Sequence, residues 1–444
     1  MEVKDMECLG GSPSGAASVR DTITDAVFGE MTDNGPNYRG LGWFATSILM
    51  TKTMIGLGVL SIPAAFDVLG LIPGVLCLLA VAAITIWSMF VVGTFKLNHP
   101  EVYAIDDVGY KLFGVTGRVF LGTTFCIYWI FVSGSGLLSI SIALNAISMH
   151  GTCTSVFVAV AAIVTFCLTS IRTLGRISWI AWIGLFSILG AIITLTIAVG
   201  IQDRPASAPL EGPWKSDYEL FKKPSFLEAA SAISTLVFAY SGTSAFFAIT
   251  VVTGTYLSIG VVVYYFCGSY VASPALGSAG VLMKKVTYGI AIPGLLASTI
   301  ILSHVSSKYI FVRLLQGSEH LTANTFQHWA TWLGCTLGAT LIAYIIASAI
   351  PVFNSLVSLV GALFGTLMSF QPMGCMWLYD NWKGNKRERT LRWYFMLAWS
   401  LFVILSGTFL MVAGTYGSVV EVIDSYKESS GSAAWSCADN SNSV

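Results

Sequence analysis

Two glycines and a proline interrupt the first long apolar segment of the chain. Gly56 and Gly58 precede Pro63 inside an apolar segment over about 43–69, which is long enough to cross a bilayer. Glycine destabilises a helix interior by about 1 kcal/mol relative to alanine, so this spacing predicts an unwound break. Backbone N–H groups freed at mid-depth must line a cavity, and the following half-helix adds the positive end of its dipole. Such a break suits a carboxylate.

A second interruption lies in the sixth apolar segment, where Ser241, Gly242 and Thr243 follow Phe238 and Tyr240. Small and hydroxyl residues at mid-depth predict another break. Small residues also let helices pack closely, and for either break alone this alternative stays open. The two segments are each the first of a group of five. Matched interruptions in two halves indicate inverted repeats with a binding site between them.

Ionisable side chains within apolar segments are costly and usually functional. Lys52 lies one turn before the first break, where it either replaces a bound cation, gates the inner path or extends to the cytosolic headgroups. His304 is either a proton carrier or a hydrogen-bonded packing residue. Asp67 either accepts external protons or lies at the interface. The candidate coupling and gating residues are Lys52, Asp67, His304, Ser307 and Lys308.

The composition is that of a membrane protein. The chain has 444 residues, of which 55% are hydrophobic and 10% charged, and its mean hydropathy is +0.75. These values exclude a soluble globular domain. About eleven apolar segments recur, which predicts an all-α polytopic membrane protein. Its expected parts are a cytosolic tail over 1–40, a transmembrane domain over 41–416 and a polar tail over 417–444.

Charge placement predicts the orientation of the chain. Lys and Arg concentrate in the tail and in the loops at 96–116, 172–176 and 379–392, so the N-terminus is expected in the cytosol and the C-terminus outside. Cys153 and Cys437 then fall outside and Cys267 lies near the outside, so a single disulfide bridge could form among them. Lys plus Arg (23) equals Asp plus Glu (23), which gives no reason to expect nucleic acid.

Several functional classes lack their signatures. The nine cysteines contain no CxxC pair, and the five histidines are too dispersed to propose a metal site. The chain has no GxxxxGK[ST] loop for ATP-driven pumping and no TVGYG-type selectivity filter. These absences argue against an enzyme, a pump and a channel.

Four motifs resemble the amino acid/auxin permease family, and most closely its fungal neutral and aromatic amino acid permeases. They are DAVFGE at 25–30, GPNYR at 35–39, IGLGVLSIP at 55–63 and FAYSG at 238–242. The resemblance covers about residues 22–425. It implies a LeuT-like fold of two inverted five-helix repeats plus one extra helix. It also implies secondary active transport of amino acids, usually proton-coupled in fungal members and sodium-coupled in some animal members.

The resemblance also implies a binding site. Amides around the first break would hold the substrate carboxylate, and carbonyls around the second would hold its ammonium. Phe238 or Tyr240 would close over the substrate, and Tyr128 of the third helix would form another wall. In this fold the eighth helix faces the first across a cation site, which Lys308 could fill unless it extends to the inner headgroups. The expected substrate-binding residues are Ile55, Gly56, Leu57, Gly58, Tyr128, Phe238, Tyr240, Ser241, Gly242 and Thr243.

One stretch departs from the family pattern. Members carry an acidic and then basic loop between the sixth and seventh helices, whereas no charged residue occurs here between Glu228 and Lys284. One helix over 226–267 would be about 63 Å long, about twice the hydrocarbon core. We expect a turn at Thr253-Gly254-Thr255, which would leave a short seventh helix. Alternatively, the two segments merge into one crossing.

We therefore expect a proton-coupled symporter of neutral or aromatic amino acids in the plasma membrane. No carboxylate occurs in either break, so nothing there favours a cationic substrate. The driving force is expected to be the proton gradient rather than sodium, with no cofactor and no metal. The expected partners are the amino acid and the lipid bilayer. Two alternatives stay open: a transport-impaired variant or non-transporting amino acid sensor, because of the missing loop, and a vacuolar exporter.

Overall fold

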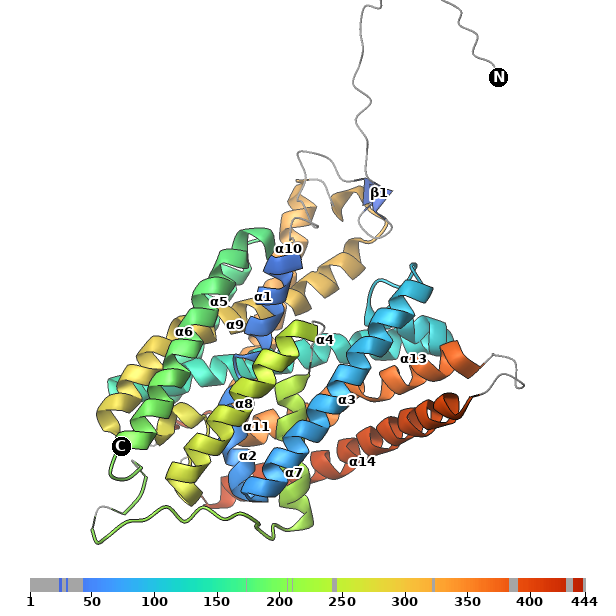
Figure 1. The fold of residues 1–444 in the computed structure, drawn as a ribbon. Coiled ribbons are helices and arrows are strands. Elements are labelled where there is room, and N and C mark those ends of the chain that lie inside the picture. The colour runs from blue at the N-terminus through green and yellow to red at the C-terminus, as the bar shows by residue number, and fades with distance from the viewer. Residues whose placement is uncertain are drawn as a thin grey trace, which may run out of the picture.

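The protein is a bundle of long helices, seen in a computed structural model (Figure 1). Two short strands, β1 (Thr24–Asp25) and β2 (Gly29–Glu30), pair beyond one end of the bundle. The structure describes residues 24–25, 29–30, 43–172, 174–205, 207–209, 211–241, 246–321, 324–382, 390–428 and 434–441.

Fourteen helices follow one another along the described chain, with short 3-10 or π turns between some of them. They are α1 (Trp43–Met54), α2 (Ile62–Leu69), α3 (Leu71–Asn98), α4 (Ile105–Ser148), α5 (Thr154–Thr169), α6 (Leu174–Ile201), α7 (Phe226–Tyr240), α8 (Phe246–Cys267), α9 (Val281–Leu315), α10 (Phe326–Ala349), α11 (Phe353–Val360), α12 (Thr366–Ser369), α13 (Gln371–Trp382) and α14 (Leu391–Glu428). The turns are η1 (Gly58–Ser61), η2 (Gly268–Tyr270), η3 (Ala275–Ser278), η4 (Glu319–Leu321) and η5 (Gly361–Gly365).

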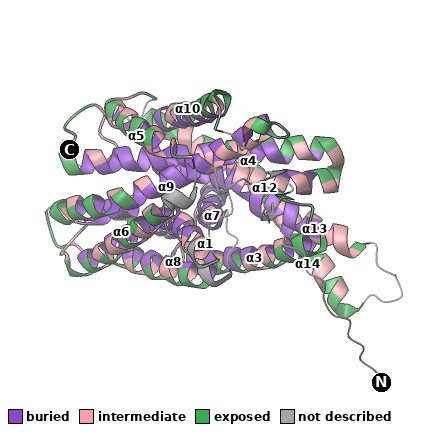
Figure 2. Ribbon diagram, turned by 90° about the horizontal axis from the view of Figure 1, so that it is seen from above, coloured by how far each residue is buried: buried purple, intermediate pink, exposed green. Residues whose placement is uncertain are grey.

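The apolar segments agree with the predicted membrane protein. Nine spans of the described chain are long and apolar enough to cross a membrane, and α5 and α7 are shorter apolar helices, so the described chain holds eleven apolar segments. Buried residues gather along the middle of the bundle, where α1, α7 and α9 lie, and exposed residues line its rim (Figure 2). Many exposed residues are large and apolar, as a lipid-facing surface requires. The expected all-α polytopic architecture is confirmed.

The position of the expected turn after the sixth segment is wrong. Helix α8 runs unbroken from Phe246 to Cys267, straight through residues 253–255. Thr255 Oγ1 donates to Val251 O of the preceding turn at 2.9 Å, so its hydroxyl is satisfied within the helix. In lipid a helix satisfies its own backbone groups, so one glycine between two threonines does not end it.

Helices α7 and α8 instead run in opposite directions. Helix α7 ends at Tyr240, and the ring of Tyr256, near the middle of α8, lies 5.2 Å from the Tyr240 ring. At the far end of α8, Tyr265 O accepts a hydrogen bond from Ser216 of the 202–225 loop that precedes α7. Helix α8 therefore returns to the side from which α7 entered, which excludes one merged crossing.

The short helix of this pair is the sixth rather than the seventh. Helix α7 has 15 residues. It is therefore about 22 Å long and falls short of the hydrocarbon core of about 30 Å. Helix α8 has 22 residues. Its length of about 33 Å suffices to cross the core alone. The expected short seventh helix is therefore wrong, because α8 is the longer of the two helices.

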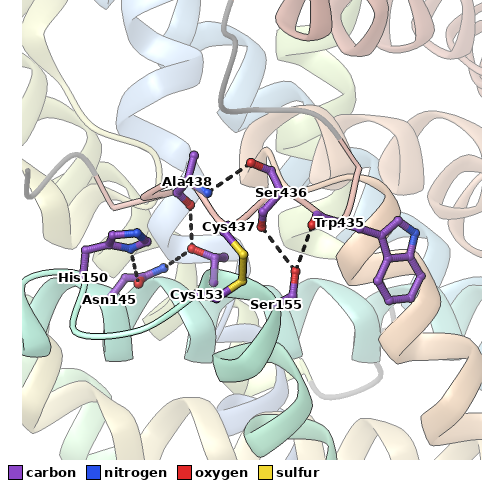
Figure 3. Close-up of a disulfide and its surroundings, with 9 residues drawn as sticks. Asn145, His150, Cys153, Ser155, Trp435, Ser436, Cys437 and Ala438 are labelled. Atoms are coloured by element: carbon purple, nitrogen blue, oxygen red, sulfur yellow. Dashed lines mark hydrogen bonds between the residues drawn. A yellow bond between two sulfur atoms is a disulfide. The ribbon is translucent and has the colours of Figure 1, made fainter.

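The C-terminal segment folds back onto the bundle. Helix α14 continues to Glu428, past the expected end of the last crossing. Residues 434–441 then lie against the ends of α4, α5 and α10, where Cys437 forms a disulfide with Cys153 (Figure 3). Disulfides persist on the non-cytosolic side of membranes, so this bridge agrees with the charge-based prediction of an outside C-terminus.

Candidate functional site

The first break is present where the glycines predicted it. Helix α1 ends at Met54 and the turn η1 begins at Gly58, and this stretch is buried. The Gly56 N–H donates to Met54 O at 2.8 Å. The N–H groups of Leu57, Gly58 and Val59 have no hydrogen-bond acceptor among the described residues. Three successive free N–H groups in a buried turn can bind an anionic group.

The second break begins at Ser241. This residue leaves the helical conformation with a ψ of 139°, and its N–H donates to Phe238 O at 3.1 Å. The last carbonyl groups of α7 therefore lie at this break, at the negative end of the helix dipole. Gly242 and Thr243, which were also expected at the substrate, lie outside the described residues.

Gly58 and Ala239 bring the two breaks into contact. A Cβ atom on Gly58 would lie 2.7 Å from Ala239 Cα, so the approach of α7 requires a glycine here. The hydroxyl of Tyr256 lies 2.8 Å from Ala239 O and 2.8 Å from Met54 O. It has one hydrogen to donate, so the two carbonyls share it. One side chain of α8 thus connects the carbonyl ends of both interrupted helices.

The three aromatic residues expected at the substrate surround the second break. Tyr128 of α4 is 2% exposed, and its hydroxyl is a hydrogen-bond partner of the Ser241 side chain. The Tyr240 hydroxyl lies 2.9 Å from Thr253 Oγ1 of α8. Phe238 is buried one turn earlier. Ile55 is also buried, but at the first break.

Lys52 is buried in the interface between α1 and α9. Its side chain is fully buried, and its Nζ lies 2.5 Å from Ser298 Oγ. No carboxylate of the described residues lies within ion-pair distance of Lys52. A Cβ atom on Gly56 would lie 3.5 Å from the same Nζ, so the ammonium adjoins the first break. The alternative in which Lys52 extends to the headgroups is therefore excluded.

The inner half of α9 holds the other candidates. His304 Nε2 lies 3.3 Å from Arg172 O, and its ring packs 5.1 Å from Trp332. His304 and Lys308 line a cavity of about 260 Å³. Ser307 Oγ donates to the carbonyl of its own helix four residues earlier, at 2.8 Å. These residues lie two to three turns beyond Ser298 and not at the breaks.

Asp67 lies at the outer end of α2 and forms an ion pair with Lys222 of the 202–225 loop, at 2.7 Å. Burial lowers the pKa of Lys222, but the hydrogen bond and charge of Asp67 outweigh it, so the pKa is raised above its usual value. The pair ties the outer loop to α2. This position agrees with the alternative in which Asp67 lies at the membrane interface.

Sequence reasoning missed Tyr256 and Ser298. Tyr256 is a polar aromatic residue in the middle of an apolar segment, and Ser298 belongs to a Ser-Thr pair in another. Both were visible as hydroxyl groups at mid-depth. Tyr256 contacts Met54, 202 residues away in sequence, and Ser298 contacts Lys52, 246 residues away, so no local pattern points to these contacts.

Comparison with protein families gives a match over most of the chain. The family model described as "Transmembrane amino acid transporter protein" matches residues 39–250 and 243–420. The two matches meet at 243–250, where α8 begins and where family residues were expected to be missing.

Three fungal relatives are similar over nearly their whole length. A "Transmembrane transporter" of Gibberella moniliformis is 34% identical over 94% of this chain and 91% of its own. A "Transmembrane transporter" of Fusarium pseudograminearum is 32% identical over 95% of this chain and 92% of its own. An "N amino acid transport system protein" of Neurospora crassa is 33% identical over 92% of this chain and 91% of its own.

Among solved structures, a Na⁺-coupled sialic acid symporter in a substrate-bound outward-open state superposes with a TM-score of 0.52 and 12% identity. The match covers 86% of this chain and 90% of the other. At this identity the likeness concerns the fold alone, and it agrees with the expected LeuT-like architecture.

Proposed function

Because the chain belongs to the transmembrane amino acid transporter family, we propose that it carries neutral or aromatic amino acids into the cell by proton-coupled symport. Family and fold make it a transporter rather than an enzyme. The observation that carries the substrate proposal is the meeting of free N–H groups at the first break with the carbonyl end of α7. These two polarities match the carboxylate and the ammonium of a zwitterion.

The lining favours an uncharged side chain on the substrate. No carboxylate occurs in either break, whereas Tyr128, Phe238 and Tyr240 provide aromatic surface around the second. Aromatic and apolar walls bind an apolar side chain through buried area, and they leave a charged one unpaired. The plasma membrane is proposed as the site of transport because the N-terminal motifs resemble those of fungal permeases.

We propose that Lys52 carries the coupling proton. Its ammonium, held by Ser298, supplies a positive charge between α1 and α9, beside the first break. A protonated Lys52 would favour a bound carboxylate nearby, and loss of its proton toward the cytosol would weaken that binding and release the substrate. One proton would thus move inward with each amino acid. Lys52 fills the α1–α9 position that the resemblance assigns to a cation, so sodium is not needed there.

A second candidate function is substrate binding without transport, as in an amino acid sensor. The observation that favours it is the short length of the sixth helix, since α7 stops at Tyr240. In the inverted-repeat mechanism the two broken helices move together when the inner path opens. A chain in which one of these helices is short would close over its substrate but open poorly to the cytosol.

Uptake of radiolabelled amino acids in a permease-deficient fungal cell tests both candidates. Neutral, aromatic, acidic and cationic amino acids are compared at acidic and neutral external pH, with sodium present or replaced. Symport predicts uptake of neutral or aromatic substrates that rises with acidity and ignores sodium. Strict sodium dependence, or uptake of charged substrates only, would contradict it. Binding by the purified chain without uptake, together with uptake by a chimera that carries a family member's loop at 242–250, would establish the second candidate.

A further inference from the structure

A cavity of about 460 Å³ opens at the outer end of the bundle between α2, α7, α11 and α14. It is separate from the breaks, and the proposed function makes no use of it. Three carboxylates lie in its walls, on Glu228 of α7 and on Glu421 and Asp424 of α14. The wall formed by α2 is apolar, with Ala64, Ala65 and Val68.

The carboxylate of Glu421 lies in the cavity wall, and its negative charge is not paired with a cation of the described residues. Its Oε2 accepts a hydrogen bond from Ser231 Oγ at 2.7 Å, and its Oε1 accepts one from Asn354 Nδ2 at 3.0 Å. Both donors are neutral. Among the described residues no cation pairs with Glu421 or Glu228, and only Asp424 has one, at 2.9 Å from Lys427. The cavity is therefore negatively charged and attracts cations.

Two polar atoms in the same wall lack partners. Ser355 of α11 is fully buried and lines the cavity, and its Oγ forms no hydrogen bond with any described residue. The Oδ1 of the neighbouring Asn354 is likewise unpaired within the described chain. Leaving a buried polar group unpaired costs about 1–3 kcal/mol, so a ligand that bonds to these oxygens would recover that free energy. Both oxygens can accept a hydrogen bond from a cation.

The size of the cavity and its apolar wall select an organic cation. Within the described residues, no group of three or more His, Cys, Asp or Glu side chains could hold a metal ion. The cavity also exceeds the volume of about 30 Å³ that one water molecule occupies. A primary ammonium group donates three hydrogen bonds, and an attached carbon chain would cover the apolar wall.

We propose that this cavity is an outer entry site that binds the ammonium group of the incoming amino acid at Glu421, before the amino acid reaches the breaks. The proposal rests on the proposed function. Helix α7 links the two places, because Ser231 lies at the cavity and Tyr240 at the second break, nine residues or about 14 Å further along the helix. Ser355 and Asn354 would accept the remaining ammonium hydrogens.

Titration calorimetry on the purified full-length chain tests the site directly. The ligand is n-butylammonium, and n-butanol is the uncharged control. We expect the wild type to bind the amine and not the alcohol, and Glu421→Gln to weaken amine binding about tenfold or more, since it removes a charge-assisted hydrogen bond. Ser355→Ala keeps every charge and should weaken binding by a smaller factor. Glu211→Gln, on the exposed outer loop, is the matched control and should bind as wild type does.

Equal binding of amine and alcohol, or unchanged amine binding in Glu421→Gln, overturns the proposal. Should Glu421→Gln fail to fold, as shown by its thermal unfolding, Ser355→Ala decides the outcome. In cells, Glu421→Gln should raise the KM for amino acid uptake about tenfold. Amine binding at Glu421 in a chain that takes up no amino acid would refute the proposed function and leave the cation site intact. Amino acid uptake by a chain that does not bind the amine would refute the cation site and leave the proposed function intact.

Discussion

The hydroxyl of Tyr256 lies 2.8 Å from the carbonyl oxygen of Met54, the last residue of α1. The same hydroxyl is 2.8 Å from Ala239 O near the end of α7. Two helix ends with negative dipoles would otherwise repel each other in a medium of low dielectric constant. A shared hydroxyl hydrogen between them offsets this repulsion, so Tyr256 sets the spacing of the two breaks.

Tyr256→Phe keeps the ring but removes the hydroxyl, which leaves both carbonyls without this donor. We expect the free energy of unfolding to fall by about 1–3 kcal/mol, and amino acid uptake to fall with it. Thermal unfolding of the purified chain and uptake at equal surface amount measure the two effects. Tyr265→Phe, at a 44% exposed position of the same helix, should change neither. An unaltered unfolding temperature in Tyr256→Phe would show that the shared hydrogen bond contributes nothing to the stability of the fold.

Gly58→Ala should separate the two breaks. The added Cβ would lie 2.7 Å from Ala239 Cα, which is backbone that cannot turn away, so α7 must move. We expect loss of substrate binding in the purified chain and loss of uptake. The matched control is Gly254→Ala in α8, where a Cβ meets nothing within 4 Å.

Gly254→Ala also tests the course of α8. In a continuous helix the change should stabilise the protein by up to about 1 kcal/mol, because alanine is the better helix former. In a turn at the same place it should destabilise the protein. Thermal unfolding of the purified variant separates the two cases.

Lys52→Met should remove the pH dependence of uptake. The variant keeps a side chain of similar length but has no proton to bind, so residual uptake should no longer rise with external acidity. Lys52→Arg should not restore the dependence, since arginine does not release its proton. Lys223→Met, on the exposed outer loop, is the control and should keep the wild-type pH profile. A Lys52→Met profile that still follows wild type would assign proton coupling to another residue.

The outer loop should stay attached to the bundle at mildly acidic pH. Burial raises the pKa of Asp217, but hydrogen bonds from the Ser269 N–H, at 2.8 Å, and from its hydroxyl outweigh it, so the pKa is lowered. A lowered pKa stabilises the fold above the unfolded value of about 3.9. The stabilisation disappears as the pH falls through the lower, folded value.

Hydrogen exchange of the backbone amides at 211–222, measured over a range of pH, checks this expectation. Corrected for the intrinsic pH dependence of exchange, protection should persist in wild type down to about pH 4. Asp217→Asn should exchange faster than wild type above about pH 4 and approach it as the pH falls through the folded pKa of Asp217. Release of the wild-type loop well above that pH would contradict the view that ionised Asp217 holds the loop to the bundle.

The sequence alone was enough to locate the first break, because its cause is local. Gly56 and Gly58 weaken the helix wherever the chain goes, and Pro63 is accepted only near the start of a new helix. The apolar segments were likewise predictable, since burial in lipid depends on the hydropathy of each segment alone. The disulfide was expected only as one bridge among three cysteines. The choice of Cys153 and Cys437, 284 residues apart, depends on where the C-terminal segment folds.

Hydropathy and helix propensity thus determined that this chain crosses a membrane many times and unwinds near Gly56. Only the tertiary structure decided that α8 stays straight through Gly254, that Lys52 turns inward to Ser298, and that one tyrosine connects both breaks. The physical reason is the distance along the sequence over which each effect acts. Propensity acts between residues within a turn or two of one another, whereas these contacts depend on how helices hundreds of residues apart pack together.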